Sequence, residues 1–315
     1  MIVFSANIST KHREKLQEEF PEQHFVFCDS PEEAKKYTDK AEVYVTYGND
    51  VDEKLINQAK QLKWVACISA GVDEFPLKKL EEEGIRLTNV RGIHKIQMAE
   101  YAITMLLQVY RNSKTLIENE KQAAWDKSVR VQEITGKRIL ILGTGAIGGE
   151  TARLAKAFRM KTIGISRSGK NVENFDEVYQ TSKLLDVLPE ADLIVSVIPS
   201  TQETKHLFTY EQFAAMKPTA VFLNMGRGDL LKEDDLLRAI QEKEFAHAVL
   251  DVFEQEPLPV NHPFWQEENI TVTPHISGLS PAYVERALKI FAENLKVYEN
   301  GENDYRNVVN LKHGY

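Results

Sequence analysis

A glycine-rich loop between an apolar run and a helical pattern constrains the fold of this chain more than any other feature. The run Arg138–Gly143 has the length of a strand, and apolar and small residues recur at helical spacing from Ala146 to Phe158. In such a unit the first glycine makes a tight turn, the second lets the backbone approach a pyrophosphate, and the third packs the helix on the strand. The free N–H groups at the start of the helix attract phosphate. The sequence therefore predicts a dinucleotide-binding loop made of Gly143, Thr144, Gly145, Ala146, Ile147 and Gly148.

Three segments of the C-terminal half have the pattern of buried parallel strands, and each is followed by one chemically active side chain. These are Ala220–Met225 followed by Arg227, Ala246–Val252 followed by Glu256, and Ile270–Thr273 followed by His275. In open α/β sheets, ligands bind outside the carboxyl ends of the strands. We therefore expect a cation, a carboxylate and an imidazole to share one site.

The three side chains have complementary chemistry. Arg227 offers a planar fork that can hold a carboxylate through two parallel hydrogen bonds, which a lysine cannot do. His275 can give or take a proton near neutral pH. Glu256, bonded to the far ring nitrogen, would fix the tautomer of His275 and favour its charged form. The trio predicts a site for acid catalysis on a substrate that carries a carboxylate.

With these motifs, the chain resembles the D-isomer-specific 2-hydroxyacid dehydrogenase family over essentially its whole length. The resemblance implies that Arg227, Glu256 and His275 are catalytic, and that Asp251 holds the nicotinamide carboxamide. The string Gly92–Glu100 resembles the start of the family's interdomain helix. The string from Ser69 to Asp73 resembles its substrate-carboxylate loop, and Pro199 is a further candidate for cofactor binding. The substrate-binding candidates are Ser69, Ala70, Gly71 and Val72.

Strands and helices alternate along almost the whole chain, which is typical of α/β proteins with parallel sheets. Because the nucleotide unit begins only near Arg138, the first hundred residues predict a second α/β domain. Its expected strands are Ile2–Ser5, His24–Cys28, Ala41–Tyr47, Lys63–Ser69 and Ile85–Asn89. We expect one long helix, Met98–Ile117, to link the domains, and the last helix, Ala282–Asn300, to return to the first domain, as the resemblance implies.

The predicted fold is therefore α/β with two domains. A Rossmann dinucleotide-binding domain would cover residues 98–280. A smaller, flavodoxin-like α/β substrate domain would cover residues 1–97 and 281–315.

The end of the second strand of the nucleotide unit departs from the NAD pattern. The fold leads us to expect an acidic residue about 20 positions beyond the glycine loop, bonded to the adenosine ribose. This chain has Ser166, Arg167 and Ser168 there. An uncharged turn with an arginine suits a 2′-phosphate, which a carboxylate would repel, and so the turn predicts NADPH in preference to NADH. The alternative is that Arg167 points to solvent and NAD binds equally well.

Composition excludes several classes of protein. The 315 residues carry a formal net charge of -8, which does not favour binding to nucleic acid or to an anionic membrane. No apolar stretch reaches about 20 residues, and the N-terminus has the pattern of a strand and not of a signal sequence. Cys28 and Cys67 lie in apolar strand patterns and are expected to be core thiols in a cytoplasmic protein. His94, His206 and His247 lack metal-ligand spacing, so no metal site is predicted.

Taken together, the residues and the resemblance predict an oxidoreductase with a small-molecule substrate. It would reduce glyoxylate, hydroxypyruvate or a short branched 2-keto acid to the D-2-hydroxy acid with NADPH, as a homodimer. Trp125 could lie in the dimer contact or serve plain packing. One alternative is an NAD-dependent dehydrogenase of the phosphoglycerate type, without its regulatory domain, or of the formate type, where glutamine would replace Glu256. Another is a dinucleotide-sensing corepressor, which would need no turnover.

Overall fold

The computed structural model describes residues 1–72 and 74–312, and it divides into two compact units. Unit 1 consists of Met1–Ile93 and Ser280–Tyr315, and unit 2 of His94–Leu279. The boundaries expected at 98 and 281 lie within a few residues of these crossings. Among the described residues, no helix has both the length and the apolar composition needed to cross a bilayer.

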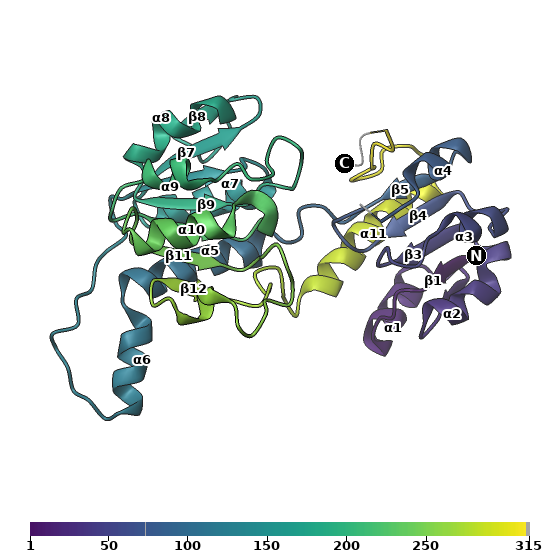
Figure 1. Cartoon of the computed structure of the whole chain (residues 1–315). Coiled ribbons are helices and arrows are strands. Elements are labelled where there is room, and N and C mark those ends of the chain that lie inside the picture. Colours follow the sequence, from purple (N-terminus) through teal and green to yellow (C-terminus); the bar gives the residue numbers. More distant parts are fainter. Residues whose placement is uncertain (73, 313–315) are drawn as a thin grey trace. The chain divides into compact units, whose positions relative to one another are not determined.

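Unit 1 is built on a five-stranded parallel sheet in the order β2-β1-β3-β4-β5, which is the order of flavodoxin-like folds (Figure 1). The strands are β1 (Ile2–Phe4), β2 (Phe25–Phe27), β3 (Val43–Thr46), β4 (Trp64–Cys67) and β5 (Arg86–Thr88). The helices are α1 (Thr10–Glu19), α2 (Pro31–Ala34), α3 (Glu53–Gln58), α4 (Leu77–Glu82) and α11 (Tyr283–Glu299), with a 3-10 turn at Lys35–Lys40. The five strands expected in this domain are confirmed, each slightly shorter than expected.

The last helix packs on the unit 1 sheet through aromatic residues. The ring of Phe291 on α11 stacks on buried Trp64 with centroids 5.5 Å apart, and it meets Phe4 edge-on at 5.4 Å. Aromatic side chains bury large apolar areas and prefer these stacked and edge-on arrangements. The chain therefore returns to its first domain after His275, as expected. Cys28 and Cys67 are buried free thiols, which confirms them as core residues.

Unit 2 contains a seven-stranded parallel sheet in the order β12-β11-β10-β9-β6-β7-β8. Counting β6 as the first strand, this is the Rossmann order 3-2-1-4-5-6 with one strand added, so the topological switch point lies between β6 and β9. The strands are β6 (Arg138–Leu142), β7 (Lys161–Ser166), β8 (Glu177–Gln180), β9 (Leu193–Ser196), β10 (Val221–Asn224), β11 (His247–Leu250) and β12 (Ile270–Val272). The helices are α5 (Lys95–Tyr110), α6 (Ser113–Lys121), α7 (Ala146–Ala157), α8 (Leu184–Val187), α9 (Tyr210–Ala214) and α10 (Glu233–Gln241), with 3-10 turns at Thr181–Lys183, Leu188–Glu190, Gly228–Leu230 and Pro263–Gln266.

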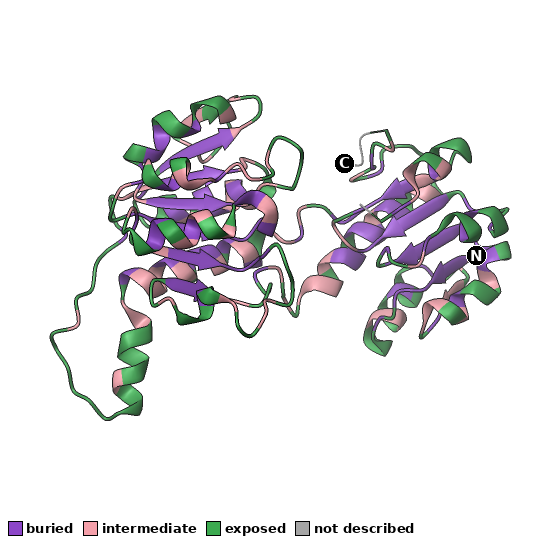
Figure 2. Ribbon diagram, in the orientation of Figure 1, coloured by how far each residue is buried: buried purple, intermediate pink, exposed green. Residues whose placement is uncertain are grey.

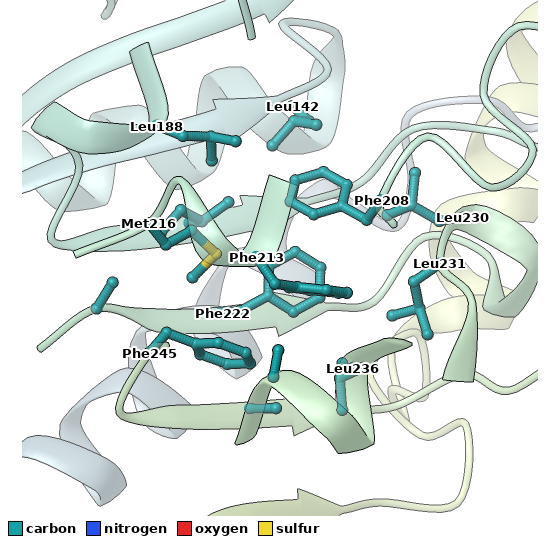
Figure 3. Close-up of a cluster of buried hydrophobic side chains, with 14 of the residues drawn as sticks. Leu142, Leu188, Phe208, Phe213, Met216, Phe222, Leu230, Leu231, Leu236 and Phe245 are labelled. Atoms are coloured by element: carbon teal, nitrogen blue, oxygen red, sulfur yellow. The ribbon is translucent and has the colours of Figure 1, made fainter. Parts of the chain in front are cut away.

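The strands of unit 2 are buried between helices on both faces, as expected for a parallel sheet (Figure 2). On one face, a cluster of phenylalanines joins β10 to α9 (Figure 3). Phe222 lies 4.9 Å from Phe208, and Phe213 stacks on Phe245 at 5.4 Å, measured between ring centroids. Phe222 belongs to the strand that leads into Arg227. The cluster therefore gives the candidate site a close-packed support.

The single long helix expected at Met98–Ile117 is wrong, because the structure has two helices there. Asn112 adopts a left-handed conformation with φ 52°, which ends α5 and starts α6 in a new direction. Asparagine tolerates this conformation better than most residues. α5 buries Ala102 and Leu106, whereas α6 buries no residue. In Figure 1, α6 and the segment 122–131 project away from the sheet of unit 2.

Candidate functional site

The glycine loop lies at the switch point of the unit 2 sheet, where β6 runs into α7. Gly143 has φ 102°, a conformation that side chains rarely adopt, and it makes the turn at the end of the strand. A Cβ at Gly148 would lie 1.8 Å from the carbonyl oxygen of Gly143, so helix and strand approach each other as only glycine allows. At Gly145, a Cβ would meet no heavy atom within 4 Å, which leaves the backbone accessible.

These features fit a dinucleotide. α7 is 12 residues long, and its first N–H groups lie in the exposed turn at Gly145 and Ala146, with Thr144 and Ile147 half-buried beside it. The segment after β9 lies next to the turn after β10, because a Cβ at Gly226 would approach the carbonyl oxygen of Ile198 to 2.7 Å. Pro199 follows there and is exposed. The residues that would hold a pyrophosphate are therefore the backbone groups of the glycine loop.

The turn proposed to select the cofactor lies at the end of β7. Ser166 is the last residue of the strand, and Arg167 and Ser168 are exposed. The Ser166 hydroxyl accepts a hydrogen bond from the N–H of Gly169 at 3.2 Å, which closes the turn. The pKa of Glu203 is lowered, first by its hydrogen bond with Thr201 and also by the charge of Arg167. Arg167 thus lies within electrostatic reach of the segment that follows β9.

Arg227 is held in a turn that the buried Asn224 shapes. The Asn224 amide donates to the carbonyl of Arg227 at 2.9 Å and accepts from the N–H of Gly226 at 3.2 Å. The Arg227 guanidinium donates from Nη1 to the carbonyl of Gly226 at 2.8 Å. Its other N–H groups have no hydrogen-bond partner within the described ranges. The guanidinium can therefore still bind a carboxylate with two donors.

His275 and Glu256 form the pair that the sequence predicts. His275 Nδ1 lies 2.7 Å from Glu256 Oε2, and Glu256 Oε1 accepts from the N–H of Phe253 at 3.0 Å. The carboxylate therefore favours the proton on Nδ1 and leaves Nε2 for a ligand. Both side chains are exposed to solvent, by 54% for His275 and 36% for Glu256. An accessible imidazole backed by a carboxylate can act as a general acid or base.

Asp251 shapes the turn that presents His275. It is fully buried, and its carboxylate accepts from the Thr273 hydroxyl at 2.6 Å and from the N–H groups of Ile276 and Ser277, both at 2.9 Å. His275 has φ 52°, a strained conformation that the surrounding structure must impose. The resemblance assigned Asp251 to the nicotinamide. Its role in the His275 turn was missed, because nothing in the sequence links it to a turn 25 residues further on.

A cavity of about 510 Å³ opens beside Arg227 in unit 2. Its lining is partly apolar and carries side chains of both signs of charge. The lining residues are Ser200, Lys205, His206, Arg227, Gly228, Asp229, Phe253 and Glu254. Several of these were not singled out from the sequence, because they come from three loops that are far apart along the chain.

The predicted carboxylate loop lies at the end of β4 in unit 1. The Ser69 carbonyl accepts from the N–H of Val90 at 3.2 Å, and the Ala70 carbonyl accepts from the Asn89 amide at 2.8 Å. Gly71 is exposed and Val72 is buried. Asp73 lies outside the described residues. Across residues 1–72 and 74–312, no three histidine, cysteine or acidic side chains are grouped so that they could hold a metal ion.

Comparisons with known proteins connect this geometry to a chemistry. A family model described as D-isomer specific 2-hydroxyacid dehydrogenase, NAD binding domain, matches residues 103–277. A glyoxylate reductase of Aeropyrum pernix is 31% identical over 271 residues, which are 82% of this chain and 80% of that protein.

Two solved structures share the whole architecture. A D-isomer specific 2-hydroxyacid dehydrogenase family protein from Aeromonas salmonicida is 36% identical, with a TM-score of 0.86 and coverage of 98% of both chains. The NADPH-dependent glyoxylate/hydroxypyruvate reductase of Sinorhizobium meliloti, solved with NADP and sulfate, is 26% identical, with a TM-score of 0.81 and coverage of 100% of this chain and 99% of that one.

Proposed function

Since this chain belongs to the D-isomer-specific 2-hydroxyacid dehydrogenase family, an oxidoreductase family, we propose that it reduces small 2-keto acids to D-2-hydroxy acids with NADPH. The proposed substrates are glyoxylate, hydroxypyruvate or a short branched 2-keto acid. The observation that carries this proposal is the 2.7 Å contact between His275 and Glu256 at the sheet edge where Arg227 also lies.

Each residue of the trio has a separate task in this reaction. Arg227 binds the substrate carboxylate through its free donors. His275 gives the proton on Nε2 to the carbonyl oxygen as that oxygen becomes an alkoxide. Glu256 stabilises the charged imidazole and keeps its orientation. Bound NADPH would supply the hydride, and the protein would orient the reactants.

Two observations support NADPH as the preferred cofactor. The turn at Ser166–Ser168 carries an arginine and two hydroxyls where an NAD enzyme would carry a carboxylate. The Sinorhizobium meliloti relative is described as NADPH-dependent. A hydrogen bond to a charged group contributes about 1.5 to 3 kcal/mol, so Arg167 and its neighbours would favour NADPH by roughly 10- to 100-fold.

Steady-state kinetics with a panel of 2-keto acids and both cofactors tests the proposal. We expect the highest kcat/KM with a small 2-keto acid and NADPH. Arg167→Ala should remove most of the preference by weakening NADPH alone. Ser166→Asp should go further, because a carboxylate repels the 2′-phosphate and offers NADH a ribose partner.

The same panel separates the alternatives. Equal use of NADH and NADPH by the unmodified enzyme would rule out the cofactor proposal but not the reaction. With 3-phosphoglycerate and NAD added to the panel, preferential oxidation of this acid would favour the phosphoglycerate-type alternative. Nucleotide binding without turnover of any acid would favour the corepressor alternative.

We further propose that the enzyme is a cytoplasmic homodimer. Two buried free thiols, Cys28 and Cys67, suit a reducing compartment. The projecting segment of α6 and residues 122–131 buries no residue on its own chain, and Trp125 is 90% exposed there. A second copy of the chain would cover this apolar surface.

A further inference from the structure

Three loops meet beside Arg227, and each of them contributes to the cavity there. The β9 loop is residues 197–209, the β10 loop is residues 225–232 and carries Arg227, and the β11 loop is residues 251–269 and carries Glu256. The position of Glu256, and with it the orientation of His275, depends on how the β11 loop is held.

The β9 and β10 loops are joined at three points. The backbone N–H of His206 donates to the carbonyl of Asp229 at 2.7 Å, and the Ser200 hydroxyl donates to the Asp229 carboxylate at 2.6 Å. Phe208 and Leu231 add an isolated parallel bridge. The β9 loop is therefore fixed to the loop that carries Arg227.

The β10 and β11 loops are in direct backbone contact. A Cβ on Gly228 would lie 1.9 Å from the carbonyl carbon of Phe253, so the residue after Arg227 must be glycine for the loops to approach this closely. The N–H of Glu254 donates to Glu233 Oε1 at 3.2 Å, which connects the β11 loop to the start of α10. These contacts hold the backbone at residues 253 and 254.

His206 makes the one side-chain link that runs from the β9 loop to the β11 loop among the hydrogen bonds of the described residues. Its Nε2 lies 2.7 Å from Glu254 Oε1, and the two side chains are 35% and 43% exposed. His206 has φ 53°, a left-handed conformation that most residues avoid. The strained conformation of His206 is therefore held in place by hydrogen bonds of both its backbone and its side chain.

We propose that His206 is a positioning residue for the reaction. By pairing with Glu254 it holds the β11 loop, and two residues further on this loop places Glu256 against His275. Its backbone bond to Asp229 holds the Arg227 loop at the same time. The proposal rests on the proposed function, because it takes His275 as the proton donor.

Two variants break the pair between His206 and Glu254. His206→Asn places a residue that tolerates the left-handed backbone, so the N–H bond to Asp229 can persist. Glu254→Ala removes the carboxylate that faces the His206 ring, while the N–H of residue 254 can still donate to Glu233. Lys183→Ala is the control, because it breaks the 2.9 Å ion pair with Asp186, which lies on the surface of the same unit and outside the three loops.

Two properties of the full-length enzyme are measured. The first is steady-state kcat and KM with its cofactor and the best acid of the panel, and the second is hydrogen exchange of the backbone amides. Each single variant should lower kcat about threefold to tenfold with KM for the acid nearly unchanged, and the double variant should be no slower than either single variant. Hydrogen exchange should become faster at the amides of Phe253 and Glu254 in both variants and stay unchanged in the control.

The outcomes are separable. Unchanged exchange in the β11 loop overturns the proposal, and so does faster exchange with an unchanged kcat or with additive losses in the double variant. An unmodified protein that turns over no 2-keto acid contradicts the proposed function, whereas exchange, which needs no substrate, still decides whether His206 holds the β11 loop.

Discussion

At the scale of single residues, two carboxylates divide the work of presenting His275. The buried Asp251 binds the backbone of the turn, and the exposed Glu256 binds the ring. The first controls where the imidazole is, and the second controls which nitrogen carries the proton. The sequence pattern could indicate the second role, because an imidazole and a carboxylate at neighbouring strand ends suggest a pair. It could not indicate the first, which depends on the conformation of residues 273–277.

Replacing His275 by alanine should lower keto acid reduction by about 100- to 10,000-fold, since a general acid contributes this much to the rate. NADPH affinity should be nearly unchanged, because the imidazole acts on the transition state. Glu256→Gln keeps the size of the side chain but loses its charge, and it should lie between His275→Ala and the unmodified enzyme. Stopped-flow reduction and fluorescence titration of NADPH measure the two quantities. Turnover of His275→Ala near that of the unmodified enzyme would remove the mechanism.

At the scale of elements, local patterns predicted most strands and the glycine loop correctly, because buried strands are continuous apolar runs between turns. The helix expected at Met98–Ile117 failed because apolar residues return at Leu116 and Ile117 after the polar stretch 111–115, while the backbone at Asn112 is left-handed. A single asparagine gives no clear break signal. The link between His206 and Glu254 was also beyond the sequence, because its partners are 48 residues apart on two irregular loops.

Two adjacent glycines of α7 should respond to alanine in opposite ways. In Gly148→Ala the new Cβ would lie 1.8 Å from a backbone oxygen, so stability should fall by about 1 to 3 kcal/mol or more and the cofactor should bind more weakly. Gly149 is the matched control, because its Cβ would meet nothing within 4 Å. Gly149→Ala should raise stability by about 0.5 to 1 kcal/mol, since glycine is unfavourable inside a helix. Urea unfolding measures both, and equal effects of the two substitutions would contradict the packing described for the loop.

His247, which links strands β11 and β12, should make the free energy of unfolding depend on pH. Burial, with a contribution from nearby Lys114, lowers the pKa of His247 to about 4, and His247 Nε2 lies 2.8 Å from the Thr271 hydroxyl. The pKa of histidine in an unfolded chain is about 6.5. Between these values the unfolded chain binds a proton and the folded protein does not, so stability falls as pH falls through this window. The loss between pH 7.5 and 5 should be about 2 kcal/mol.

Unfolding by urea at the two pH values measures this loss. His247→Gln should show a smaller loss than the unmodified protein, because the variant has no titrating ring at this position. His24→Gln, at an exposed position of unit 1, serves as the control and should keep the full loss. An unchanged pH dependence in His247→Gln would show that other groups cause it.

At the scale of the whole molecule, the chain crosses between its units twice and distributes the candidate residues over both. Ser69–Val72 belong to unit 1, and Arg227, Glu256 and His275 belong to unit 2. The second crossing follows directly after the His275 turn, and α11 then anchors the chain in unit 1 through Phe291. The alternation of strands and helices predicted both domains, because each sheet needs its own covering helices.

The projecting segment of unit 2 leaves large apolar side chains uncovered by its own fold, and this leads to the prediction of a dimer. Leu116 and Trp125 line a hollow of about 450 Å³ on this segment, and they are 42% and 90% exposed. Sedimentation velocity should give a particle of twice the 35.9 kDa of one chain. Replacing both residues by glutamate should produce the single chain, because losing a buried aromatic anchor costs an interface about 2 kcal/mol or more.

Val260→Glu is the matched control, since Val260 is 97% exposed in the same unit and lies outside the segment, and it should leave the dimer intact. A single chain in the unmodified protein, or a dimer that survives both glutamates, would show that this surface does not bind a second copy.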